Sequence, residues 1–184
     1  DSVEKSQWLE VVFSETPFYG ESGGQEGDHG RIIGRSQDGT TDFEGEVIDV
    51  QKPVADLIVA HVKPIRGSIK VGQSYHQQTD LEIRALTARN HTATHLLHWA
   101  LRKHFGEHVK QAGSLVSPDL LRFDFTHFQA LTRQDWMAIE DLINEKVWTG
   151  HVVQKQVMSK DAALQKGAIA FFGDKYGDEV RVVS

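Results

Sequence analysis

The apolar residues of the first 79 positions fall in short runs, separated by glycine, proline and Asp-Gly turns. Such runs between turn residues predict strands, here over residues 9–13, 31–33, 46–50 and 57–62. Several short strands at this spacing are typical of a small closed sheet. We therefore predict an all-β unit over residues 1–79, folded as a small β-barrel.

From residue 80 onward the period of the pattern is helical. Asp80 is a typical N-cap, and the helix that it opens is predicted to run to about Phe105, with a break near Asn90. Two more helices are predicted over residues 132–150 and 159–166, and strands over 111–116, 121–125, 152–157, 171–172 and 180–183. The predicted fold class is α+β, with residues 80–184 forming a unit of helices on an antiparallel sheet.

The composition is that of an ordinary globular protein, with 39% hydrophobic and 25% charged residues among 184. No apolar run approaches the roughly 20 residues that cross a bilayer, and no signal peptide is visible. The absence of cysteine excludes disulfides, so we expect a cytoplasmic protein. The net charge of −6 argues against a module that binds nucleic acid mainly by neutralising phosphates.

Two histidines, His91 and His95, lie four residues apart in the first predicted helix. Because one helical turn separates them, both imidazoles can reach one metal ion. The apolar stripe of this helix, which includes Leu101, lies on roughly the opposite side, so His91, His95 and His98 are expected to line a polar cleft. Thr94 lies about 60° from His91 on the helical wheel, and its hydroxyl can face the same cleft.

The spacing alone leaves a second interpretation open, that of histidines on a solvated helix surface. A zinc site takes three or four protein ligands, and this pair provides two. No glutamate follows His91, which excludes the HExxH arrangement of metalloproteases. Thr94 likewise has an alternative, because threonine hydroxyls in helices often bond back to a helix carbonyl.

Four stretches of the chain add the context that the histidine pair lacks. They are the glycine-punctuated loop 16–28, the helix segment 90–97, the strands within 109–128, and the segment 167–183. In this order they closely resemble the editing region of the bacterial alanyl-tRNA synthetase family, and together they extend over nearly the whole chain. The resemblance also implies a β-barrel (1–79) followed by a helix-on-sheet editing domain (80–184).

The resemblance implies roles for particular residues. It makes His91 and His95 zinc ligands, and it places Gln111 near the metal, where the amide contacts the serine hydroxyl of a mischarged substrate. Gly23 and Gly24 belong to a loop over the editing pocket that helps to exclude the correct alanyl substrate. In the family a Cys-Gly-Gly-Thr-His motif completes the zinc site. This sequence has no cysteine, so two zinc ligands are expected beyond residue 184.

The implied substrate is the acceptor end of tRNA(Ala) carrying serine or glycine, whose ester the site hydrolyses with Thr94 and Gln111 as catalytic candidates. The implied partner is the remainder of the synthetase, which ligates alanine to tRNA(Ala) with ATP. Because the zinc site is incomplete, the chain alone is expected to be inactive and to bind zinc weakly. Two alternatives stay open, a free-standing trans-editing deacylase and a non-catalytic module that docks tRNA. From the residues alone, Gly23-Gly24 can also be a tight turn, and Gln111 an edge residue facing water.

Overall fold

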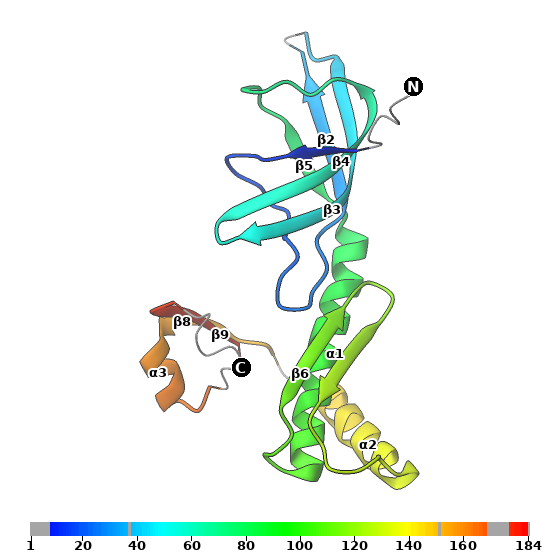
Figure 1. Cartoon of the computed structure of the whole chain (residues 1–184), viewed down its shortest axis with the longest axis vertical. Helices are drawn as coiled ribbons and strands as arrows, with labels where there is room; N and C mark the ends of the chain where they lie inside the picture. Colours follow the sequence, from blue (N-terminus) through cyan, green and yellow to red (C-terminus); the bar gives the residue numbers. More distant parts are fainter. Residues whose placement is uncertain (1–7, 37, 151, 169–176, 184) are drawn as a thin grey trace, which may run out of the picture.

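The computed structural model describes residues 8–36, 38–150, 152–168 and 177–183, and it begins with a five-stranded antiparallel sheet (Figure 1). The strands lie in the order β1-β4-β3-β2-β5. Their bounds are β1 Leu9–Val11, β2 Gly30–Arg35, β3 Thr41–Val54, β4 Leu57–Gly67 and β5 His76–Thr79. The four predicted strands are all present, although β1 ends before the predicted residue 13, and β5 is an addition to them.

Among the described residues this sheet does not close into a barrel, which corrects that part of the predicted fold. β1 and β5 lie at the two ends of the strand order, where β1 pairs with β4 and β5 pairs with β2. The two edge strands are short, with three and four residues, so each offers few unpaired backbone groups to another strand. The α+β class itself agrees with the observed elements.

The sheet packs around an apolar core of its own. Buried residues alternate with more exposed ones along β2 and along the first half of β3, as a strand with one buried face requires. β-Bulges in β3 allow this long strand to bend over the core. The fully buried members are Ile32, Phe43, Val47, Val50 and Val62.

α1 (Leu81–Phe105) follows β5 and carries the chain from the sheet into a second unit (Figure 1). Asp80 caps the helix as predicted, since its carboxylate accepts hydrogen bonds from two backbone N–H groups of the first turn. The predicted break near Asn90 is wrong, because α1 is continuous. The Asn90 amide donates to the carbonyls of Ser117 and Pro118 instead of competing for the helix backbone.

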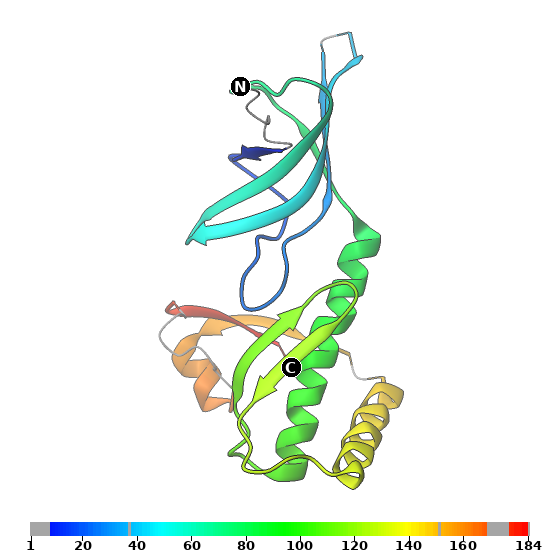
Figure 2. The same ribbon diagram turned by 45° about the vertical axis from the view of Figure 1, so that its right-hand side comes forward.

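The second unit packs a hairpin and a helix against α1 (Figure 2). The hairpin consists of β6 (Gln111–Val116) and β7 (Leu121–Phe125), and the helix is α2 (Arg133–Thr149). The predicted capping box and the terminal glycine of α2 are both confirmed. The buried residues that α1, α2 and the segment before β6 share are Ala100, Leu101, Val109 and Ile139.

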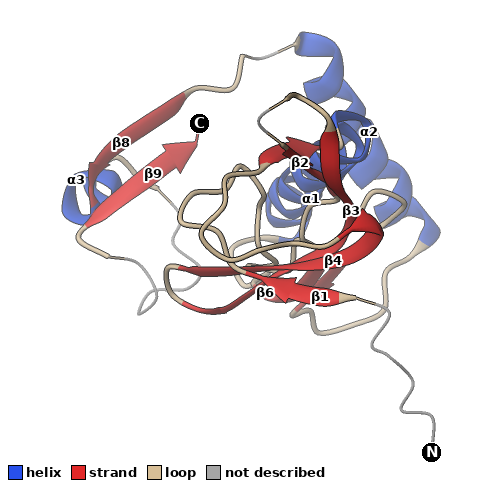
Figure 3. Ribbon diagram, turned by 90° about the horizontal axis from the view of Figure 1, so that it is seen from above, coloured by secondary structure: helices blue, strands red, loops and turns tan. Residues whose placement is uncertain are grey.

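A third group of elements stands to one side of α1 and β6 (Figure 3). It consists of β8 (Lys155–Ser159), α3 (Lys160–Gln165) and β9 (Glu179–Val183), with β8 and β9 paired antiparallel. The strand predicted at residues 171–172 lies outside the described residues. Of the helices that are described, none has the length and apolar character needed to cross a membrane.

Candidate functional site

The loop between β1 and β2 extends away from its own sheet toward α1 and β6 (Figures 1 and 2). Near its tip, Gln25 forms a parallel bridge with Val116 at the end of β6. The N–H of Val116 donates to the Gly24 carbonyl at 2.7 Å, and the N–H of Glu26 donates to the Val116 carbonyl at 3.0 Å. Backbone hydrogen bonds therefore join this loop to the second unit.

The close approach of the loop to β6 depends on glycine at position 24. Gly24 has a φ of 84°, a region that favours glycine, and a Cβ atom there would lie 2.4 Å from the Ser114 carbonyl oxygen. On the other side, the Ser114 hydroxyl donates to the Gly23 carbonyl at 3.4 Å. A side chain at position 24 would consequently push the loop off the strand.

An ion pair holds the base of the loop against α1. The carboxylate of Asp28 is buried, pairs with the guanidinium of Arg84, and accepts a hydrogen bond from the backbone N–H of Tyr19. Arg84 also donates to the Pro17 carbonyl at 2.7 Å. The hydrogen bond to Asp28 raises the pKa of Arg84, so the guanidinium remains charged. Both ends of the loop are thus fixed to one arginine of the helix.

His91 and His95 present exposed imidazoles side by side on α1. Their rings are stacked, with centroids 5.0 Å apart and an interplanar angle of 14°. The Nδ1 atom of His91 lies 2.6 Å from the Oε1 atom of Gln25. The tip of the loop therefore contacts the histidine pair directly.

The pKa of His91 is lowered from its usual value. Partial burial is the largest cause, followed by the nearby charges of His95 and of Arg181 on β9. A neutral imidazole keeps a lone pair, which is the form that binds metals and accepts protons. The electrostatics of the site thus favour His91 as a ligand or base.

Gln111, at the start of β6, is connected to the same loop through one serine. Its Nε2 donates to the hydroxyl of Ser114 at 3.0 Å, and that hydroxyl donates to the Gly23 carbonyl. The structure therefore brings Gly23, Gly24 and Gln111 together around Ser114. The same loop carries the contact to the histidines through Gln25.

Thr94 lies between the two histidines in sequence, but its hydroxyl is turned toward the helix backbone. The residue is 7% exposed, and its Oγ1 donates to the Asn90 carbonyl at 2.8 Å. A hydrogen bond back to a helix carbonyl is the alternative role that the sequence leaves open for Thr94. It uses the hydroxyl hydrogen and leaves the oxygen available as an acceptor.

His98 does not share the exposed surface of the other two histidines, contrary to the prediction. It is 5% exposed, and its ring centroid lies 5.1 Å from that of Phe123 on β7. Burial is also the largest cause of its lowered pKa. The helical wheel assigns His98 to a face of α1 but does not show which element covers that face. At the turn of His98 it is the β6–β7 hairpin. Leu101, by contrast, is fully buried as predicted, whereas Leu96 and Leu97 of the same apolar stripe are only partly buried.

Two imidazoles placed side by side suit a zinc ion by the chemistry of their donor atoms. Within the described parts of the chain, no group of three or more histidine, cysteine or carboxylate side chains is placed to hold a metal. His91 and His95 therefore fit one half of a tetrahedral zinc site. Any further ligand would have to come from outside the described residues.

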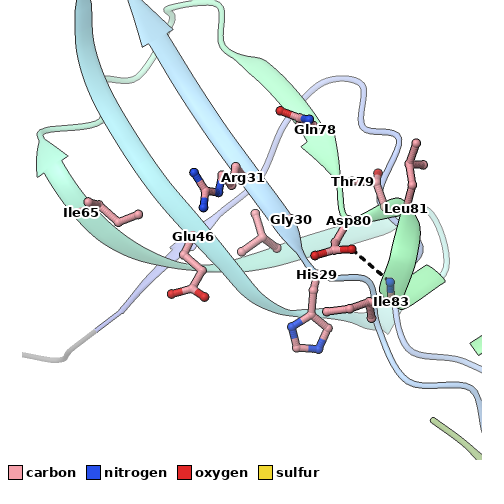
Figure 4. A pocket seen from close by; sticks show the side chains of 11 residues that line it. His29, Gly30, Arg31, Glu46, Ile65, Gln78, Thr79, Asp80, Leu81 and Ile83 are labelled. Atoms are coloured by element: carbon pink, nitrogen blue, oxygen red, sulfur yellow. Dashed lines mark hydrogen bonds between the residues drawn. The ribbon is translucent and has the colours of Figure 1, made fainter. Parts of the chain in front are cut away.

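A separate open hollow, with a volume of about 560 Å³, lies between the sheet and the start of α1 (Figure 4). Arg31 and Glu46 line it from the neighbouring strands β2 and β3, where they form a cross-strand pair. Asp80 and Ile83 border it at the beginning of the helix. None of the six residues predicted for the functional site lines this hollow, so it is distinct from the histidine site.

Comparisons with known proteins agree with the resemblance. The profile of the family described as tRNA synthetases class II (A) matches residues 1–83. The whole chain is 48% identical to part of the alanine–tRNA ligase of Sorangium cellulosum and 49% identical to part of that of Carboxydothermus hydrogenoformans. The chain belongs to the alanine–tRNA ligase family. A further member, from Myxococcus xanthus, is 47% identical over 96% of the chain.

The chain spans about a fifth of the length of these alanine–tRNA ligases, 19% for the Sorangium and Myxococcus proteins and 20% for the Carboxydothermus protein. The similarity to Sorangium extends over all 184 residues, so it includes both the loop and the histidine helix. The similarity to the alanine–tRNA ligases therefore extends over all the segments that carry the constellation described above.

Two residues of the constellation, Gln25 and Arg84, are not identified as functional by the sequence patterns. A signal for Arg84 exists, because it lies seven residues before His91 and hence two turns away on the same face of α1. No sequence signal makes Gln25 a partner of His91. Their contact follows from the way the first unit places its loop over the second.

Proposed function

We propose that this chain is the editing part of a cytoplasmic alanyl-tRNA synthetase, and that within the full-length enzyme it hydrolyses the ester joining serine or glycine to tRNA(Ala). The full-length enzyme would ligate alanine to tRNA(Ala) with ATP. The observation that supports this most is the contact between Gln25 of the Gly-Gly-Gln loop and His91, which are 66 residues apart in sequence. Through it, the two stretches that suggest editing form one site.

A second hydrolytic site has a physical reason. An alanine pocket must reject glycine, which is smaller, and serine, which differs by one hydroxyl. Differences of this size are worth only about 1–3 kcal/mol in an apolar pocket, so binding alone discriminates too weakly. A separate site that destroys the wrong ester removes the errors that the first site admits.

In this proposal His91 and His95 hold a zinc ion together with ligands from outside the described residues. Zinc in such a site, when bound, polarises a carbonyl or activates a water molecule. The lowered pKa of His91 keeps its ring neutral and its lone pair available at neutral pH. With two ligands among its described residues, this chain alone is expected to hold zinc weakly and to be inactive.

Selectivity in this proposal comes from Gln111 and the loop. The half-buried amide of Gln111 pairs with the serine hydroxyl, and an alanyl ester leaves that amide without its partner. The backbone at Gly23 and Gly24 lies against β6 and limits the space beside the amide. The Thr94 oxygen, whose hydrogen is engaged by Asn90, serves as an acceptor.

Deacylation and aminoacylation measured side by side on the full-length synthetase test this function. We expect His91→Ala or His95→Ala to abolish hydrolysis of seryl-tRNA(Ala) while leaving attachment of alanine largely intact. His76→Ala, at an exposed position of β5, is the matched control and should change neither activity. Histidine variants that deacylate at the parent rate would refute the catalytic role, and weaker tRNA binding in those variants would then favour a docking module.

A further inference from the structure

We infer that Gln25 is a positioning residue for His91. Its side-chain carbonyl accepts the Nδ1–H of His91 and thereby holds that ring in the one tautomer whose Nε2 lone pair is free for the site. The effect of this hydrogen bond on activity rests on the proposed function. The hydrogen bond itself is tested without reference to activity.

The chemistry of the contact fixes the position of the imidazole hydrogen. The two atoms that meet at 2.6 Å are Nδ1 of His91 and Oε1 of Gln25. An amide carbonyl oxygen can only accept a hydrogen bond, so the hydrogen must be on Nδ1. A neutral imidazole carries a single N–H, and Nε2 is then left with its lone pair.

The loop restricts the position of the Gln25 side chain. The residues on either side of it, Gly24 and Glu26, are both hydrogen-bonded to the backbone of Val116. The base of the loop is held by the Asp28–Arg84 ion pair. The face of α1 that carries His91 thus also carries Arg84, which anchors the loop that supplies Gln25.

This tautomer has a consequence for function. Binding of a metal and acceptance of a proton both require the Nε2 lone pair, because Nδ1 faces the loop. Imidazole rings in water favour the other tautomer, with the hydrogen on Nε2, which presents a donor where the site needs an acceptor. Histidines that bind metals generally donate their second N–H to an oxygen atom that fixes the ring, and Gln25 supplies such an atom.

Long-range ¹H–¹⁵N NMR spectra of the imidazoles in this chain test the inference, recorded at a pH at which His91 is neutral. We expect His91 to be the Nδ1–H tautomer in the parent chain and in Gln25→Glu, whose carboxylate still accepts. In Gln25→Ala it should change predominantly to the Nε2–H tautomer. Gln134→Ala, at an exposed position of α2, is the control and should leave the His91 signals unchanged.

An Nε2–H tautomer in the parent chain, or an unchanged tautomer in Gln25→Ala, overturns the inference whatever the enzyme activity. In the full-length synthetase, Gln25→Ala should lower kcat for seryl-tRNA(Ala) deacylation by tenfold or more with little change in KM, and Gln25→Glu should retain most of it. A change of tautomer with no change in kcat would also overturn the positioning role. Failure of the proposed function has a separate signature, which is full deacylation by His91→Ala.

Discussion

His91 and His98 lie seven residues apart on the same face of α1, and they occupy opposite environments. His91 is exposed beside His95, with one ring nitrogen on the tip of the Gly-Gly-Gln loop. His98 is buried against Phe123 under the β6–β7 hairpin. The period of a helix assigns a residue to a face, whereas the element that covers each turn of the face decides whether a side chain is a candidate for chemistry or part of the core.

Two different elements cover the two parts of α1. The loop from the first unit covers the turns from Arg84 to His91 and leaves the imidazoles open to solvent. The hairpin, which follows α1 directly in the chain, covers the turns near His98 and closes them. The open part is therefore the place where two distant segments of the sequence meet, and the closed part is local core.

The largest expected effect is on stability, at the buried histidine. His98→Asp places a carboxylate against Phe123, and we expect a loss of about 2–3 kcal/mol in the free energy of unfolding, because the new charge is poorly solvated. His95→Asp, at the exposed position, should change it by less than about 0.5 kcal/mol. Urea unfolding of both variants measures the difference. Equal losses would mean that the two parts of the face are not distinct.

A smaller loss is expected at the anchor of the loop. Arg84→Ala leaves the buried carboxylate of Asp28 without its charged partner, and we expect a cost of about 1–3 kcal/mol. The exposed pair of Arg31 and Glu44 supplies the control, since Arg31→Ala should cost at most about 1 kcal/mol. Urea unfolding gives both values. If Arg84→Ala cost no more than Arg31→Ala, the loop would not depend on this anchor.

The pH dependence of stability should be smaller again. The pKa of His91 and that of His98 are both lowered in the folded chain, chiefly by burial. At a pH between the folded and the unfolded pKa the unfolded chain binds more protons. This contribution to stability is therefore complete above the usual histidine pKa of about 6.5 and is lost as the pH falls below it. Urea unfolding from pH 7.5 to 5 should show the decline. His91→Gln should flatten the slope of this decline, and equal slopes in His91→Gln and the parent would contradict the assignment.

The smallest effect concerns selectivity. In the proposed site, Gln111→Ala would remove one neutral hydrogen bond to the hydroxyl of the substrate's serine, so we expect about a 2- to 10-fold loss in the preference of deacylation for seryl- over alanyl-tRNA. The control is Gln129→Ala, at an exposed position after β7. The ratio of the two deacylation rates is the measurement. An unchanged ratio would remove Gln111 from the recognition of serine.

Much of the fold follows from local patterns. The period change at residue 80, the cap at Asp80 and the capping box of α2 locate the helices, because these signals act over a few residues. The open sheet, the continuity of α1 at Asn90 and the burial of His98 do not follow. Each depends on which segment packs against which, and a side chain such as Asn90 reads as a helix breaker until its partners in the hairpin are known.

The candidate site divides in the same way. His91 and His95 are found from their spacing, and the glycine loop and Gln111 are placed near them by family resemblance. The contacts of Gln25 and Arg84 are found only when the first unit is folded, since their partners are 66 and 56 residues away, although Arg84 shares a helix face with His91. Residues that could bind a metal or a substrate can be recognised in the sequence from their side-chain chemistry. Residues that position them can be recognised only from their contacts in the folded chain.

The substitution of one glycine tests most directly whether the glycine loop and the histidine helix form one hydrolytic site. Gly24 and Gly39 share a φ of 84°, but a Cβ atom at Gly24 meets Ser114 at 2.4 Å and one at Gly39 meets nothing within 4 Å. The measurement is deacylation of seryl-tRNA(Ala) beside alanine attachment, by full-length synthetase carrying Gly24→Val or Gly39→Val. We predict that Gly24→Val lowers deacylation by tenfold or more and keeps alanine attachment, and that Gly39→Val keeps both. Deacylation at the parent rate by Gly24→Val would mean that the glycine loop and the histidine helix do not form one hydrolytic site.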